Sequence, residues 1–275
     1  MRKFIPFALL GIMLLASCNF PLGSSKPDAQ TLATNVAQTL TAWPTLSSTL
    51  TPIPSPTLIN ATPTATATQT IAPTATTPAN DPVLTLGNPS FEDTFTSGSG
   101  FGLKTPYEDS AIKITVEDGS MMFRSLAIQQ GRRWRLTYPF ARNLYLEGTF
   151  TTLSCAGTDN YGLMFRAPQY NDGIGYYVGL SCKGQVFMDW YDGSKSHTLL
   201  DWTFAPSALT GKDQTNRLGV MAVDSQISIY VNGVLVKTVN TDALKDRGHF
   251  GVFVNASETP NFTFKVDVIK EWDQP

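Results

Sequence analysis

Acidic side chains are the residues of this chain best suited to acid–base chemistry. Cleavage of a glycosidic bond needs two carboxyl groups about 5–10 Å apart, which on a β-strand means acids at alternate positions. Here the clearest pairs, Glu92-Asp93 and Glu108-Asp109, are adjacent in the sequence. Neighbouring residues of a strand point to opposite faces, so we expect both pairs to be solvated turn residues and not a catalytic pair.

The histidines give no metal site and no activated nucleophile. His197 and His249 lie in unrelated turn-like segments, with no His or Cys at metal-ligand spacing, and we expect both on the surface. The sequence also lacks a Gly-x-Ser-x-Gly elbow, a phosphate-binding glycine loop and a zinc-protease motif. It therefore predicts no catalytic residue, no metal ligand and no cofactor.

A set of aromatic and charged residues is the best candidate for binding. In residues 161–166, 176–181 and 186–191, alternating apolar residues identify the face that packs on a core. The opposite face then carries Met164, Arg166, Tyr177, Phe187, Asp189 and Tyr191. Aromatic rings stack on the apolar faces of sugars while polar groups bond the hydroxyls, so these six residues predict a glycan groove. The alternative is that loops cover this face and that Arg166 pairs with Asp189 as a structural bridge.

Short alternating segments from residue 83 onward must position these side chains. Asp118-Gly119 and Asn232-Gly233 predict tight turns, which join residues 112–116 to 121–123 and residues 227–231 to 234–239 as hairpins. Further strands are expected at residues 144–153, 161–166, 176–181, 186–191, 218–223, 250–254 and 262–269. No segment has a convincing helical period, so residues 83–275 are predicted to form an all-β, two-sheet antiparallel sandwich.

The segment before this domain has the composition of a spacer. No Asp, Glu, Lys or Arg occurs from Ala29 to Asn80, and Thr, Pro, Ala and Ser dominate residues 41–80. Such a composition cannot bury a core, and its prolines favour extended backbone. Residues 19–82 are therefore predicted to be a disordered, stiffened linker.

The N-terminus has the layout of an export signal. Arg2 and Lys3 precede an apolar run from Phe4 to Leu15, which is too short to span a bilayer. The run ends in Leu-Ala-Ser-Cys, which resembles the lipobox of bacterial lipoproteins. The resemblance implies cleavage of residues 1–17 and acylation of Cys18. We therefore expect an extracytoplasmic protein, anchored to a bacterial membrane by its lipid.

Cys155 and Cys182 are then left in a compartment that permits disulfides, and we predict that they pair. If all three strands belonged to one sheet, the two cysteines would lie at the ends of the strands on either side of residues 161–166. At about 4.8 Å between neighbouring strands, their Cα atoms would be roughly 10 Å apart. A disulfide allows only about 7 Å between Cα atoms. The pairing is therefore expected only if both cysteines overhang the sheet edge.

The order of these segments resembles the concanavalin A-like superfamily of laminin G and jelly-roll domains, in particular 3-keto-disaccharide hydrolase modules. The matching pieces are Phe91-Glu92-Asp93, residues 161–166, Tyr176-Tyr177 leading to Lys183-Gly184-Gln185, Tyr230-Val231-Asn232-Gly233, residues 248–254 and residues 264–268. The resemblance implies two curved antiparallel sheets and a concave face that often binds glycans. Catalytic relatives carry a Glu-x-Asp-x-x-Glu run, which is absent here. Relatives often bind calcium near the positions of Asp93 and Asp267, but two carboxylates are not a site and none is predicted.

The charge of the chain argues against a nucleic-acid partner. The formal net charge of −2 becomes −4 once Arg2 and Lys3 are removed with the signal, and no basic cluster occurs, so we expect no nucleic-acid partner. A monomer with a glycan or envelope partner is expected. Three functions stay open: a non-catalytic glycan-binding module, a glycosidase or 3-keto-disaccharide hydrolase, and a structural or protein-binding envelope domain.

Overall fold

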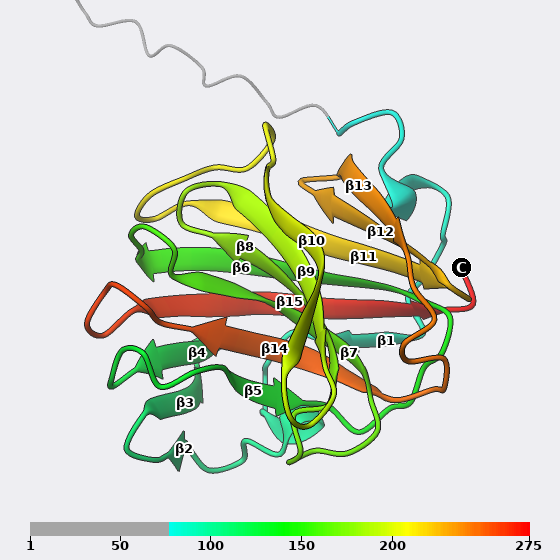
Figure 1. Cartoon of the computed structure of the whole chain (residues 1–275). Coiled ribbons are helices and arrows are strands. Elements are labelled where there is room, and N and C mark those ends of the chain that lie inside the picture. The colour runs from blue at the N-terminus through cyan, green and yellow to red at the C-terminus, as the bar shows by residue number, and fades with distance from the viewer. Residues whose placement is uncertain (1–76) are drawn as a thin grey trace, which may run out of the picture. The chain divides into compact units, whose positions relative to one another are not determined.

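The computed structural model describes residues 77–275 (Figure 1). The predicted signal peptide, Cys18 and residues 19–76 of the predicted linker lie outside the described residues. The described part contains fifteen β-strands and two short 3-10 helices, η1 (Pro82–Leu84) and η2 (Ser99–Phe101). None of its helices has both the length and the apolar character needed to cross a bilayer.

The strands form two antiparallel sheets, the smaller of which has six strands in the order β10-β9-β8-β7-β14-β5 and lies in front in Figure 1. Its members are β5 (Arg133–Leu136), β7 (Asn160–Ala167), β8 (Gly175–Ser181), β9 (Gln185–Tyr191), β10 (Ser196–Phe204) and β14 (His249–Asn255). The larger sheet has nine strands in the order β13-β12-β11-β6-β15-β4-β3-β2, with β1 paired to β15. Its members are β1 (Phe91–Asp93), β2 (Tyr107–Glu108), β3 (Ile112–Glu117), β4 (Ser120–Ser125), β6 (Leu144–Ser154), β11 (Thr215–Val223), β12 (Gln226–Val231), β13 (Val234–Asn240) and β15 (Thr263–Asp273). This arrangement confirms the predicted two-sheet jelly-roll sandwich.

The two hairpins read from the sequence are present. Asp118 and Gly119 join β3 to β4 with φ of 50° and 69°, and Asn232 and Gly233 join β12 to β13 with φ of 52° and 79°. Two consecutive positive φ values are the signature of a type I′ turn, whose twist matches that of the paired strands. Local turn chemistry therefore sets the pairing next to each turn, and the β12–β13 register shifts further along, between Ile229 and Tyr230.

The main core fills the space between the sheets and is rich in stacked aromatic rings. Phe264 of β15 lies 5.0 Å from Phe123 of β4 and 5.2 Å from Tyr161 of β7, measured between ring centroids. All three rings are buried. The stack therefore links the nine-stranded sheet to the six-stranded sheet, and truncation of a ring at its centre would cost about 3–5 kcal/mol.

The chain enters the domain across the outer face of the nine-stranded sheet. The buried Asp81 carboxylate forms an ion pair with Arg217 of β11. Nη1 of Arg217 also lies 3.4 Å from Oε1 of Glu147 in β6. Trp272 of β15 donates a hydrogen bond to the carbonyl oxygen of Gly87 at 3.0 Å. Residues 81–87, which we call the strap, are therefore attached to this sheet, although the sequence places residues 81 and 82 in the linker.

The assumption that residues 144–153 and 176–181 flank residues 161–166 in one sheet is wrong. In the structure β7 pairs with β8 and β14, while β6 belongs to the nine-stranded sheet. The alternation of apolar residues identifies the buried side of a strand but not the sheet to which the strand belongs.

Candidate functional site

The outer face of the six-stranded sheet, which we call the open face, carries a second apolar cluster. Its buried members are Leu136, Met164, Ala167, Tyr177, Phe187 and Phe253, with Trp134 and Tyr191 packed against them. One register row crosses five strands through Trp134, Phe253, Gly162, Gly179 and Phe187. The row thus has aromatic residues at both sides and two glycines in the middle.

The two glycines leave room for the phenylalanine rings to lie on the sheet. A Cβ atom at Gly179 would lie 2.2 Å from Cε1 of Phe187, and one at Gly162 would lie 2.8 Å from Cε1 of Phe253. The two rings meet edge to face with centroids 6.2 Å apart, a favourable geometry for aromatic pairs. The floor of the open face is therefore closely packed and aromatic.

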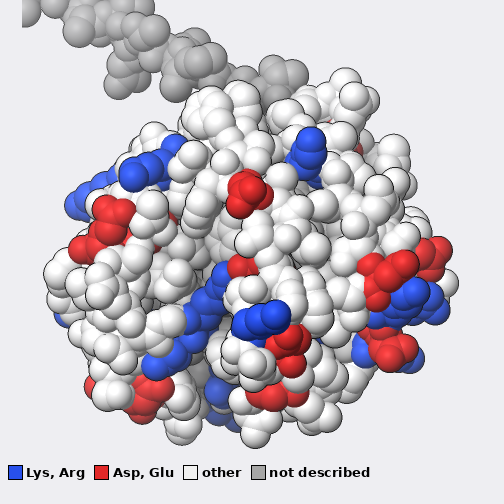
Figure 2. Space-filling view, viewed as in Figure 1, with Lys and Arg blue, Asp and Glu red and all other residues white. Residues whose placement is uncertain are grey.

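Arg132, just before β5, crosses this floor. Its Nη1 donates to Oδ1 of Asp189 at 2.7 Å, and its Nη2 donates to Oδ2 of the same carboxylate. The guanidinium carbon lies 4.5 Å from the Tyr177 ring centroid and 5.3 Å from that of Phe187. We call this pair the Arg132–Asp189 bridge. Figure 2 shows the same side of the molecule, with basic surface in a hollow that meets acidic surface near the centre.

Two depressions lie beside the bridge and share Arg132 and Asn255. The first, which we call the Trp134 pocket, has a volume of about 450 Å³ and is lined by Gly131, Arg132, Arg133, Trp134, Asp172, Tyr177, Tyr191, Ser196 and Asn255. The second, which we call the Trp202 pocket, has a volume of about 270 Å³ and is lined by Arg132, Asn160, Phe187, Asp189, Thr198, Leu200, Asp201, Trp202 and Asn255. Each combines aromatic surface with amide, hydroxyl and carboxylate groups, a composition suited to a hydroxyl-rich ligand.

Five of the six predicted site residues share the open face. Met164, Tyr177, Phe187 and Tyr191 form or pack against its apolar cluster, and Asp189 belongs to the bridge. Tyr177 and Tyr191 line the Trp134 pocket, whereas Phe187 and Asp189 line the Trp202 pocket. Met164 is fully buried and lines neither of these two depressions.

The placement of Arg166 on this face is wrong. Arg166 has a φ of 50°, and the pairing of β7 with β14 is irregular there, because His249 pairs with Ala167 while Gly251 pairs with Met164. Such a β-bulge inserts one extra residue and cancels the alternation on which the prediction depends. The buried Arg166 side chain instead donates to the carbonyl oxygens of Arg142 and Leu244, at 2.9 and 3.0 Å.

The expected alternative, a bridge between Arg166 and Asp189, is wrong for the same reason. The partner of Asp189 is Arg132, which the sequence analysis missed together with Trp134 and Trp202. These three residues lie in or beside the two edge strands of the six-stranded sheet, β5 and β10. The available signal was a tryptophan flanked by arginines at 132–135, in a run too short to stand out as a strand.

Tyr177 contributes its ring to the floor and not a proton. Burial raises the pKa of its hydroxyl, which donates a hydrogen bond to the carbonyl oxygen of Gly173 at 2.6 Å. With the hydroxyl held in this way, the ring plane is fixed beneath Arg132. The residue therefore gives shape to the Trp134 pocket.

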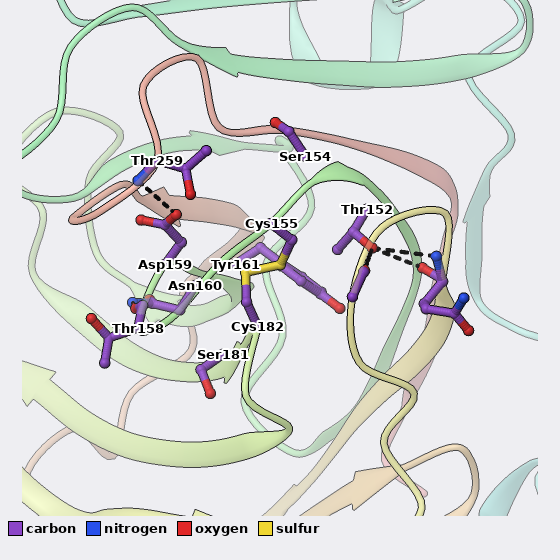
Figure 3. The surroundings of a disulfide bond; sticks show 12 residues. Thr152, Ser154, Cys155, Thr158, Asp159, Asn160, Tyr161, Ser181, Cys182 and Thr259 are labelled. Atoms are coloured by element: carbon purple, nitrogen blue, oxygen red, sulfur yellow. Dashed lines mark hydrogen bonds between the residues drawn. A yellow bond between two sulfur atoms is a disulfide. The ribbon is translucent and has the colours of Figure 1, made fainter.

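The Cys155–Cys182 disulfide is present, with Cα atoms 5.4 Å apart (Figure 3). Cys155 follows the last residue of β6 and Cys182 follows the last residue of β8, so both overhang the ends of their strands. Because these strands belong to different sheets, the bond ties the two layers together at one end. The separation of roughly 10 Å expected within a single sheet does not apply.

Both histidines have aromatic neighbours. His197 of β10 stacks on Trp190 at 4.4 Å and its Nε2 lies 2.7 Å from Oδ2 of Asp192. This hydrogen bond, with two backbone N–H donors, lowers the pKa of Asp192 well below its usual range. The surface position expected for His249 is wrong, because Phe140 and Tyr170 each lie 3.9 Å from its ring and bury it.

Across residues 77–275, no three His, Cys, Asp or Glu side chains gather as a metal site would require. Asp93 accepts a hydrogen bond from the backbone of Phe95. Asp267 accepts from Ser120 and Thr151 and pairs with Lys265 at 3.1 Å. The two acids considered for calcium thus have protein partners.

No protein-family profile matches the sequence, and no curated protein matches it significantly. Among solved structures, a protein of unknown function with a galectin-like fold from Bacillus subtilis is 10% identical, with a TM-score of 0.51 over 68% of this chain and 98% of that chain. The domain has a galectin-like fold.

Two further structures match at lower scores. The carbohydrate-binding module CBM66 from Bacillus subtilis is 15% identical, with a TM-score of 0.46 over 55% of this chain and 86% of that chain. A xylan β-1,4-xylosidase from Bacillus halodurans is 11% identical, with a TM-score of 0.44 over 66% of this chain and 39% of that chain. At these identities similarity extends to the fold alone, so any function must be argued from the open face.

Proposed function

We propose that this protein is a lipid-anchored, extracytoplasmic lipoprotein that presents a non-catalytic glycan-binding module. The observation that carries the proposal is the pair of depressions on the open face, where aromatic side chains and hydrogen-bonding groups lie together. Sugar rings offer apolar C–H faces to aromatic side chains and hydroxyls to polar groups. The open face supplies both kinds of contact within one groove.

The fixed floor favours binding without rearrangement. The phenylalanine rings lie over glycines, the Tyr177 hydroxyl is bonded to backbone, and Arg132 is held by two hydrogen bonds to Asp189. A surface that is already ordered loses little conformational entropy when ligand binds. The groove is therefore preorganised.

The strap places the entry of the chain on the side opposite the open face. Asp81 pairs with Arg217 on the outer face of the nine-stranded sheet, and the open face belongs to the other sheet. The described residues that lead into the domain therefore do not cover the groove. This geometry supports a display role.

Hydrolysis is less well supported than binding. Asp189 and Asp201 both line the Trp202 pocket, and carboxylates are the residue class that glycosidases use. Both oxygens of Asp189, however, already accept hydrogen bonds from Arg132. It is therefore poorly placed to donate a proton to a leaving group.

Binding to an array of bacterial, plant and animal glycans by the purified full chain tests the proposal. We expect retention on at least one glycan, with loss of retention when both Trp134 and Trp202 are replaced by alanine. Absence of binding to every glycan, or release of sugar products from the bound glycan, would refute a non-catalytic module. Anchoring is tested separately, because Cys18→Ala should abolish palmitate labelling and release the protein from membranes.

A further inference from the structure

Asn160, the first residue of β7, has an unused hydrogen-bond acceptor in the Trp202 pocket. Its side chain lines this pocket and is only 2% exposed. Nδ2 donates to the carbonyl oxygen of Thr158 at 2.9 Å, whereas Oδ1 is buried without a hydrogen-bond partner. Rotating the amide by half a turn would place two oxygens against each other, so the orientation is fixed. A buried acceptor without a partner favours a ligand that brings a donor.

The chain around Asn160 is held rigidly (Figure 3). The Cys155–Cys182 disulfide closes one side, and the amide of Cys182 donates to the carbonyl oxygen of Asp159 at 3.0 Å. On the other side, the buried Asp159 carboxylate accepts backbone hydrogen bonds from Ser257, Glu258 and Thr259 at 2.7, 2.7 and 2.9 Å. The Asn160 amide is therefore held in a preorganised corner beside the Trp202 pocket.

Trp202 gives the same pocket an accessible aromatic surface. Its side chain is 41% exposed and packs on Phe187 with ring centroids 4.6 Å apart. Because Phe187 is held over Gly179, the indole has a firm support. An exposed, supported indole beside a buried acceptor is suited to stack on the C–H face of a sugar while a hydroxyl reaches Asn160.

Charge and size narrow the ligand class. Within the pocket the charges of Arg132 and Asp189 neutralise each other, while Asp201 has no ion-pair partner among residues 77–275. The remaining negative charge repels uronic and sialic acids. The volume of about 270 Å³ is just below the roughly 300–1,000 Å³ of sites for drug-sized ligands, which fits a single sugar ring.

We propose that the Trp202 pocket holds one neutral monosaccharide unit of the glycan, stacked on Trp202, with one hydroxyl donating to Oδ1 of Asn160. This assignment rests on the proposed glycan-binding function and adds the position and charge class of the recognised unit. The unit next to it lies over the shared residues Arg132 and Asn255, toward the Trp134 pocket.

Affinity electrophoresis tests the assignment with the purified full chain in gels containing dextran, xylan, galactomannan or laminarin, and in gels containing alginate or polygalacturonate. We expect retardation by at least one neutral polysaccharide and by neither acidic one. Trp202→Ala should weaken the interaction at least tenfold. Phe204→Ala, which removes a 64% exposed ring from the same strand, should change it less than twofold. Asp201→Asn should raise the affinity for acidic polysaccharide relative to the wild type.

The outcomes separate the two proposals. Retardation by a neutral polysaccharide that survives Trp202→Ala but not Trp134→Ala would overturn the pocket assignment and leave glycan binding intact. Retardation by acidic polysaccharide alone would also overturn the assignment. No retardation by any of these polysaccharides, together with no binding on the array, would overturn both. Matching circular dichroism and melting temperature of each variant show that it is folded.

Discussion

Replacement of Arg132 by methionine tests whether the centre of the open face is a fixed structural bridge. Methionine keeps most of the apolar stem but removes the guanidinium that bonds both oxygens of Asp189. The Asp189 carboxylate, whose side chain is 9% exposed, would then lie in the groove without its charged partner. We expect this single substitution, next to an edge strand, to cause a large loss of stability.

The magnitude follows from the burial of the pair. Removal of one partner from a fully buried ion pair costs about 3–5 kcal/mol. The Arg132 side chain is 20% exposed, so solvent screening reduces this to about 2–3 kcal/mol. Loss of the cation–π contact with Tyr177, at 4.5 Å, adds about 0.5–1 kcal/mol. The sum is about 3 kcal/mol, or a fall in melting temperature of about 6–12 °C for a domain of this size.

Equilibrium unfolding in guanidinium chloride, combined with a double-mutant cycle, measures the effect. Arg132→Met and Asp189→Leu should each lower the free energy of unfolding by about 3 kcal/mol, and the double variant should lose much less than the sum of the two. An additive double variant, or an Arg132→Met loss below about 0.5 kcal/mol, would show that the pair is solvated and that Arg132 is a free side chain.

Three further variants test other parts of the structure. Replacing Cys155 and Cys182 by serine opens a loop with a sequence separation of 27. This variant should have a free energy of unfolding lower by about 3.5 kcal/mol and should be retained more weakly on glycan. Unchanged chemical denaturation would show that the disulfide contributes nothing to stability. Burial raises the pKa of Glu271 from 4.5 to about 7, so the folded protein binds this proton more tightly than the unfolded chain. Stability present below about pH 4.5 should therefore fall by about 1–2 kcal/mol as the pH rises to about 7, and Glu271→Gln should remove that fall in urea titrations at pH 5 and 8; an identical pH profile in the variant would contradict this. Gly179→Ala forces a methyl group against Phe187 and should lower the free energy of unfolding by about 1–3 kcal/mol, whereas an unchanged melting temperature would mean that the ring has room to move.

The sequence predicts the two hairpins well because local rules determine them. The alternation in β3 and β12 and the turns at Asp118-Gly119 and Asn232-Gly233 act over a few residues, and the structure has the same hairpins. Periodicity also identified five residues of the open face correctly. These features depend on turn chemistry and side-chain alternation, both of which act within a single hairpin or strand.

The errors arise where a strand departs from regular pairing. The bulge at Arg166 moves one predicted site residue away from the open face, and the sequence has no mark that reveals it. β10 has two register shifts against β9, and its mixed exposure hides the alternation. β5 has only four residues. Trp202 and Trp134 lie on these two edge strands, so both were missed as site residues.

The central claim, that glycan binds on the open face of the six-stranded sheet, is tested most directly by nuclear magnetic resonance. The isotope-labelled full chain would be titrated with an oligosaccharide from the polysaccharide that retards it. We predict shifts at Asn160, Trp202 and Asn255, with no change at Tyr230 and Lys270 in the nine-stranded sheet. Shifts confined to the nine-stranded sheet, or to loops far from both pockets, would contradict the account.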